Sequence, residues 1–343
     1  MIELTNDGLD FSFHELHGSA QLRIDFQRTL RIPDDGTDYA LPPGLGPFPL
    51  RHVDDFSRVP AHWRERGGVM LPMYQSEAVW IKFSQPHDAK RGAAYPFAVK
   101  LASGKVSAIT GEAWRPGLNR GPQDYVVVPS QPWLDGFVVA KGVIRQFVAM
   151  PLGAGYTTEE QITGKGEHGG LQIMVYPMKR EAFERRFPVR APRPRAPEGW
   201  PLAASVASLR EAELDMGMAP GGRMRQEIYA DEFALDEWDT SHSSRCFVHL
   251  ANSLVWRAIT GEHPPTTPPT AAEYTRSGLP WFDYYGEGSA VDATRALERL
   301  RSVLDLARER GDVPLPENEP VAPDRVIKLR PRRSRHEVRE GAF

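Results

Sequence analysis

The stretch Ala20-Gln21-Leu22-Arg23-Ile24-Asp25-Phe26 alternates apolar and polar side chains at every step. Successive side chains of a strand point to opposite faces, so this pattern predicts a strand with one buried and one wet face. Outward from it, similar runs rich in Val, Ile, Phe, Tyr and Trp recur, and these residue types suit a pleated, half-buried surface. The runs cover residues 77–83, 95–101, 123–128, 142–150 and 170–176.

No helical pattern of about ten residues separates these runs, which argues against the alternating strands and helices of a parallel sheet. The chain also holds 31 prolines in 343 residues, above the usual share of about 5%, and proline favours turns and edges over long regular elements. We therefore predict an α+β protein with a mainly antiparallel β-sandwich or barrel-like body, followed by a helical C-terminal region.

The clearest boundary is the segment Arg190-Ala191-Pro192-Arg193-Pro194-Arg195-Ala196-Pro197, whose alternate prolines favour polyproline II and forbid a helix. We expect a β-rich body over 1–189, a proline and arginine linker over 190–201, and a helical region over 202–324 that packs on the body. The apolar spacing predicts helices over 204–214, 244–260 and 290–310, the last with a stop at Gly311.

Residues 325–343 carry seven Lys or Arg side chains and few apolar ones, so we expect a disordered basic tail. A solvated tail is the simpler interpretation, and weak contact of 325–339 with RNA or an acidic partner is the alternative. The whole chain has a net charge of -3, so nucleic acid is not otherwise expected as a partner. A small molecule or a protein is the partner that remains.

The compartment follows from three features. Cys246 is the single cysteine and cannot form an intramolecular disulfide, and residues 1–7 lack the basic and then apolar order of a signal peptide. The apolar stretches fall far short of the ~18 residues needed to cross a bilayer. We expect a cytoplasmic protein that is not integral to a membrane.

A glycine-rich segment after the strand at 142–150 is the first candidate for a site. Six glycines between 153 and 170 accompany polar side chains, and glycine permits positive φ and close backbone approach. The alternative is a flexible hairpin whose glycines only make turns. The spacing around Lys165 does not fit a phosphate-binding P-loop. The polar residues in question are Glu159, Gln161, Lys165 and His168.

Just upstream, Gln131-Pro132-Trp133-Leu134-Asp135-Gly136 places an indole and a carboxylate at a predicted turn. Such a pair can stack on and hydrogen-bond a planar or sugar ligand. Alternatively, Trp133 anchors a loop and Asp135-Gly136 closes the turn. The combined ligand-binding candidates are Trp133, Asp135, Arg145, Gln161, Lys165 and His168.

His242, Cys246 and His249 are spaced by four and three residues, which would place them on one face of a helix. Two imidazoles and a thiolate could bind zinc, or the thiol could act as a nucleophile beside a histidine. Because buried cysteine is ordinarily inert and metal sites draw on more than one element, we favour a structural role and expect no metal site. No motif specifies a cofactor.

Three phrases carry a resemblance: residues 131–136, the run from Ile144 to Gly153 (IRQFVAMPLG) and the run from Leu279 to Tyr285 (LPWFDYY). With them, the chain resembles a group of uncharacterised bacterial and fungal proteins, some of which are labelled integral membrane proteins. The hydropathy contradicts that label. The resemblance implies no activity, cofactor or ligand.

Two function classes remain open. The first hypothesis is a non-catalytic ligand-binding or scaffolding protein that uses the glycine-rich β-edge loop. The alternative is a hydrolase or transferase in which Asp135, Glu159 and His168 supply acid and base groups within the same cleft. That alternative requires the three side chains to converge on one point.

Overall fold

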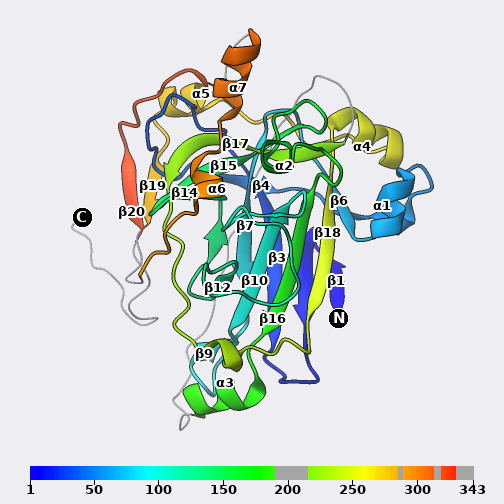
Figure 1. Cartoon of the computed structure of the whole chain (residues 1–343), viewed down its shortest axis with the longest axis vertical. Helices are drawn as coiled ribbons and strands as arrows, with labels where there is room; N and C mark the ends of the chain where they lie inside the picture. Colours follow the sequence, from blue (N-terminus) through cyan, green and yellow to red (C-terminus); the bar gives the residue numbers. More distant parts are fainter. Residues whose placement is uncertain (190–214, 285–288, 313–317, 330–343) are drawn as a thin grey trace, which may run out of the picture.

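The computed structural model describes residues 1–189, 215–284, 289–312 and 318–329 (Figure 1). Within these residues, nine strands form the first sheet, in the order β1-β2-β3-β7-β15-β14, with β13 and β4 pairing onto β7 and β3 and with β17 beside β15. These strands are β1 (Ile2–Thr5), β2 (Gly8–Ser12), β3 (Gln21–Thr29), β4 (Gly44–Pro47), β7 (Ala78–Ser84), β13 (Trp133–Leu134), β14 (Gly136–Ala140), β15 (Val143–Pro151) and β17 (Met216–Arg225).

Seven strands of the described residues form a second sheet in the order β11-β10-β16-β18-β6-β5, with β12 beside β10. Two strand pairs are separate from both sheets: β8 (His87–Asp88) with β9 (Ala93–Ala94), and β19 (Trp281–Tyr284) with β20 (Val326–Leu329). The strands of the second sheet are β5 (Arg51–His52), β6 (Val69–Pro72), β10 (Phe97–Ser103), β11 (Val106–Ser107), β12 (Val126–Val128), β16 (Leu171–Pro177) and β18 (Ser244–Ala251).

The pairing is mostly antiparallel, and β6 with β18 and β19 with β20 are parallel pairs. Both strand orders are open among the described residues, so the barrel-like alternative is wrong. Side chains from both sheets share one hydrophobic cluster, to which some strands contribute alternate residues and others, such as β12, contribute consecutive ones. Members of the cluster include Leu22, Ile24 and Phe26 of β3 and Phe97, Val99 and Leu101 of β10.

Short helices lie at the ends and edges of the sheets (Figure 1). Figure 1 places α1 and α4 together at one edge, and Trp63 and Trp256 from these two helices belong to one small apolar cluster. The helices are α1 (Ala61–Arg66), α2 (Thr158–Thr163), α3 (Arg180–Arg186), α4 (Ser253–Thr260), α5 (Ala271–Arg276), α6 (Arg295–Glu298) and α7 (Val303–Arg310), with 3-10 turns η1 (Val53–Asp55) and η2 (Leu235–Glu237).

The predicted strands are confirmed with shifted ends, since β3, β7, β10, β12, β15 and β16 all overlap the period-two runs. The helix predicted over 244–260 is wrong in its first half. Residues 244–251 form strand β18 in the second sheet, and only Ser253–Thr260 is helical, capped by the Asn252 side chain. A short apolar run fits either a buried strand or a buried helix, which is why the pattern misled.

The helix predicted over 290–310 is two short helices, α6 and α7, separated near Leu300. Gly311 ends α7 in the left-handed conformation, as expected. Strands β17 and β18 fall within 202–324, so that range is not wholly helical. In the predicted tail, residues 326–329 form β20 rather than a disordered chain. The predicted linker, the helix over 204–214 and the rest of the tail lie outside the described residues.

Candidate functional site

The glycine-rich segment contains the helix α2, and it is not an open loop as we expected. Thr157 and Glu160 form a capping box at its start, with the Thr157 side chain accepting from Glu160 N and the Glu160 side chain accepting from Thr157 N. Gly164 ends the helix with φ 76°. The residues from Gly164 to Gly170 then return to β16. A six-residue helix therefore supports the return segment that carries His168.

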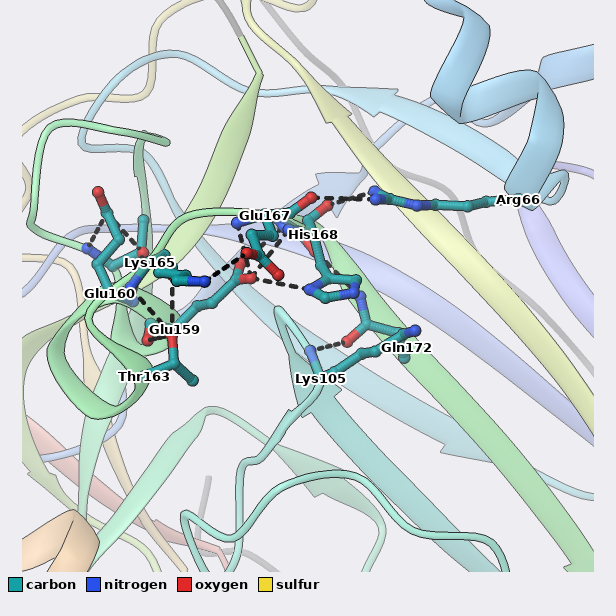
Figure 2. Close-up of polar contacts among 11 residues, drawn as sticks. Arg66, Lys105, Glu159, Glu160, Thr163, Lys165, Glu167, His168 and Gln172 are labelled. Atoms are coloured by element: carbon teal, nitrogen blue, oxygen red, sulfur yellow. Dashed lines mark hydrogen bonds and ion pairs between the residues drawn. The ribbon is translucent and has the colours of Figure 1, made fainter.

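Glu159 lies on α2 and holds this return segment in place through its carboxylate (Figure 2). Its residue is 2% exposed, and its carboxylate accepts the backbone N–H groups of Glu167, His168 and Gly169 at 3.0, 2.9 and 2.8 Å. A side chain at Gly104, in the neighbouring β-turn, would overlap the Glu159 carboxylate. Three successive N–H groups aimed at one buried carboxylate fix the path of residues 167–169.

The same carboxylate holds the His168 imidazole, with Nδ1 3.0 Å from Glu159 Oε1. An ionised carboxylate can only accept, so Nδ1 donates and the neutral ring carries its lone pair on Nε2. Nε2 has no hydrogen-bond partner within the described parts of the chain, and the His168 side chain is 25% exposed. A fixed imidazole with one nitrogen available can bind a ligand or exchange a proton with it.

Helix α1 joins the return segment through Arg66. The guanidinium donates to the carbonyl oxygens of His168 at 2.8 Å and Glu167 at 3.0 Å (Figure 2). It also lies 5.3 Å from the centre of the Phe247 ring. His62, one turn earlier on α1, has Nε2 2.6 Å from Asp215 Oδ2. These contacts define what we call the two-histidine junction: His62, Arg66, Glu159, His168 and Asp215.

A turn from β10 to β11 borders the two-histidine junction. Lys105, at its tip with φ 59°, donates its backbone N–H to Gln172 Oε1 at 2.5 Å, and Gln172 Nε2 donates to Gly169 O at 3.0 Å. The Lys105 side chain is exposed. The turn is thus tied to the return segment through Gln172, with the exposed Lys105 at its tip.

Asp135 is not joined to Glu159 or His168 by any hydrogen bond among the residues that the structure describes. It is buried, and its carboxylate accepts a hydrogen bond from Gln226 Nε2 at 2.6 Å. Its backbone carbonyl accepts the N–H of Phe147 at 2.9 Å. Burial raises the pKa of the Asp135 carboxyl to about 7, and hydrogen bonds from Trp133 and Gln226 oppose the rise. The predicted convergence of three acid and base groups is therefore reduced to the pair Glu159 and His168.

The other predicted ligand-binding residues mostly have structural partners. The Arg145 guanidinium contacts Asp34 Oδ1 at 3.3 Å and Gly221 O at 3.1 Å. The Gln161 amide bridges Tyr156 O and the backbone of Arg301. Trp133 packs on Tyr284 with ring centres 4.8 Å apart, and Lys165 is exposed beside Glu167. Of these residues, Lys165 alone is close to the two-histidine junction and exposed.

The hypothesis of one helical face carrying His242, Cys246 and His249 is wrong, because Cys246 and His249 lie on strand β18 and positions three apart on a strand face opposite sides. Burial raises the pKa of the Cys246 thiol to about 12. The His249 ring stacks between Trp63 and Phe247, and burial lowers its pKa to about 3. His242 pairs separately with Asp239 at 2.8 Å.

Sequence reasoning missed Lys100, a lysine in the apolar strand β10. Its ammonium donates to Asp124 Oδ2 at 2.7 Å and to the carbonyls of Arg115 and Gly117 at 2.9 and 2.7 Å, and it lies 5.5 Å from the centre of the Trp114 ring. A pocket of about 320 Å³ opens beside it. All three N–H groups are used, so Lys100 holds the loop around 115–124 and offers no free amine. The feature of the sequence that could have identified Lys100 is its position as a single charged residue inside an otherwise apolar strand.

Across residues 1–189, 215–284, 289–312 and 318–329, no group of three or more His, Cys, Asp or Glu side chains could hold a metal ion. Within the same residues, no helix has both the length and the apolar character needed to cross a membrane. Comparison with known proteins found no matching family model, no matching curated protein and no matching solved structure.

Proposed function

We propose that the protein binds a small anionic molecule at the two-histidine junction, with His168 in direct contact with the ligand. The observation that carries this proposal is the arrangement of His168, whose Nδ1 is held by the buried Glu159 while Nε2 has no partner in the described residues. A side chain fixed in one orientation loses little entropy when it meets a ligand.

The charge around His168 supports an anion. Glu159 is surrounded by three backbone N–H groups, and Lys165 lies 3.4 Å from Glu167. Both charges of Arg66 and Lys105 then remain without a carboxylate partner among the described residues, since Arg66 bonds only to carbonyl oxygens and the ring of Phe247. A protonated His168 imidazole would balance the negative charge of Glu159, so that the charges of Arg66 and Lys105 remain in excess.

Acid and base catalysis is the second candidate, and one observation favours it. A carboxylate that holds Nδ1 leaves Nε2 as the atom that accepts a proton, which is the role of histidine in many hydrolases and transferases. Among the described residues, no hydroxyl or thiol is hydrogen-bonded to Nε2, so a nucleophile would have to be water or a group of the substrate. We favour ligand binding over catalysis, because binding requires no nucleophile beyond the residues that the structure describes.

The test is a titration of the histidine Cε1–H signals by NMR with sodium acetate and sodium phosphate at constant ionic strength. We expect the His168 signal to move to saturation with at least one of these anions. The matched control is His242, which is also paired with a carboxylate and is 44% exposed in its side chain. If the two signals respond equally and without saturation, the proposed site does not bind anions.

A further inference from the structure

We propose that the protein binds a neutral sugar in the pocket beside Lys100, at a site separate from the anion site proposed at His168. The pocket measures about 320 Å³, which is at the small end of the ~300 to 1,000 Å³ that ligand pockets span, so it suits a single sugar ring. Its walls come from β10, from β11 and from the chain between Thr110 and Asp124. We call it the Trp114 pocket, after the half-buried indole that lines it.

The backbone around the Trp114 pocket is held in place by its own contacts. Two lining side chains, Lys100 and Asp124, form an ion pair at 2.7 Å and are 3% and 13% exposed. The Lys100 ammonium also donates to the carbonyls of Arg115 and Gly117 at 2.9 and 2.7 Å. Asp124 Oδ1 accepts the N–H of Asn119 at 2.9 Å. Because these bonds fix the chain that carries the lining side chains, little backbone ordering is left to accompany binding.

Polar groups on this fixed backbone remain available to a ligand. The Glu112 carboxylate and the Arg115 guanidinium line the pocket, are exposed, and have no hydrogen-bond or ionic partner in the parts of the chain that the structure describes. The same holds for the Trp114 indole N–H and for the side-chain NH2 of Asn119, whose oxygen accepts the N–H of Gly121 at 3.3 Å. The pocket thus offers one acceptor group and three donor groups from four side chains.

A second pocket, of about 380 Å³, differs in this respect. Its lining includes Arg120, Gln123 and Asp231. Arg120 donates to two backbone carbonyl oxygens at 2.7 Å, and the Asp231 carboxylate accepts from Tyr125 Oη at 2.5 Å and from Trp238 Nε1 at 2.9 Å. Gln123 donates to the carbonyl of Tyr125 at 2.9 Å and accepts the N–H of Asp231 at 2.8 Å. Because these polar groups are used within the protein, we assign the ligand to the Trp114 pocket.

The charges of the Trp114 pocket select a neutral ligand. Four of the residues that line it are charged, and their charges cancel: Lys100 and Arg115 are positive, and Glu112 and Asp124 are negative. An anion would therefore meet two carboxylates without a net positive charge to offset them. An indole beside donors and an acceptor suits a pyranose, because the C–H groups of the sugar pack on the ring and its hydroxyls both donate and accept.

The experiment is a ¹⁹F NMR titration of the full chain, with all eight tryptophans labelled as 5-fluorotryptophan, using glucose, galactose and mannose. Trp114→Phe assigns the Trp114 signal by its loss. We expect at least one of these sugars to move the Trp114 signal to saturation, with a dissociation constant on the order of 1 mM. The signal of Trp133, a half-buried tryptophan that does not line the pocket, should stay still.

Glu112→Ala removes an exposed side chain and should weaken binding of that sugar about tenfold, because a hydrogen bond to a charged group is lost. The matched control is Glu3→Ala, at an exposed glutamate that does not line the pocket, and it should leave binding unchanged. Glucuronate and glucosamine, which add one negative or one positive charge to glucose, should not bind more tightly than the neutral sugars.

Three results would overturn this inference: a Trp114 signal that none of the neutral sugars moves, tighter binding of a charged sugar, or equal binding by wild type and Glu112→Ala. None of them bears on anion binding at His168, which is read from a different signal with different probes. Conversely, failure of anion binding at His168 leaves the Trp114 pocket untouched.

Discussion

Glu159 and Asp135 are both buried carboxyl groups from the part of the sequence that predicted the site, yet their surroundings differ. Glu159 accepts three backbone N–H groups and an imidazole, whereas Asp135 accepts from the Gln226 amide and has a further hydrogen bond from Trp133. Burial dominates at Asp135 and raises its pKa to about 7. At Asp135, burial outweighs the two donors, whereas the four donors at Glu159 tie its carboxylate to residues 167–169.

The largest expected effect is that of Glu159→Ala. It leaves the N–H groups of 167, 168 and 169 without their acceptor, and we expect the free energy of unfolding to fall by about 3 to 5 kcal/mol. Urea denaturation measures it. The matched control is Glu167→Ala, an exposed position where the change should stay within about 0.5 kcal/mol. Equal losses of stability in the two variants would contradict the claim that the Glu159 carboxylate holds residues 167–169 in place.

Lys100→Met applies the same comparison to a buried cation. The variant removes the single donor shared by Asp124 and the carbonyls of Arg115 and Gly117, and we expect a loss of about 3 kcal/mol in the free energy of unfolding. Lys105→Met, at an exposed side chain, is the control and should change stability little. A stable Lys100→Met protein would show that one charge does not hold this loop.

Asp135→Asn tests the second carboxyl of the comparison, through the way that stability depends on pH. A carboxyl whose pKa is near 7 in the folded protein and about 3.9 in the unfolded chain binds more protons when folded, so its contribution to stability falls as pH rises from about 4 to about 7. Asparagine has no such titration. The variant should therefore gain stability relative to wild type across this range, by on the order of 4 kcal/mol at most.

The check is urea denaturation of both proteins at several pH values between 4 and 8. The difference between them isolates Asp135 from other buried groups such as Glu77, whose pKa burial raises to about 6. A difference that stays constant with pH would mean that Asp135 has enough donors after all.

The smallest effect on stability is expected for His168→Gln, because the imidazole is one donor of four to Glu159 and the others belong to the backbone. We expect a loss below about 1 kcal/mol, together with the loss of anion binding. Thermal unfolding with and without phosphate measures both. A large loss of stability would assign His168 to the framework of the loop instead of to a ligand.

The sequence predicted the strands because their period of two is local and strong, as in Ala20 to Phe26. It also identified Glu159 and His168 as candidates on one segment. It missed α2, although Thr157 and Glu160 carry the capping-box spacing, because glycines on both sides suggested a loop. Likewise, Cys246, Val248 and Leu250 alternate along β18, but the apolar residues that continue to 259 also fit a helical pattern.

What the sequence could not supply were contacts between distant segments. His62 and Arg66 lie about a hundred residues before Glu159, and no local pattern joins them to it. The same holds for Gln226 beside Asp135, which takes that carboxyl out of the predicted cleft. Such pairs follow from how the sheets are assembled, and a single sequence carries no record of that.

The most direct test of the account is the position of the proton on the neutral His168 ring. Long-range ¹H–¹⁵N spectra of the imidazoles at pH 8 report which nitrogen carries it. The account predicts the proton on Nδ1, shared with Glu159, and a free lone pair on Nε2. A ring that carries its proton on Nε2 would contradict both the hold of Glu159 on His168 and the site built on it.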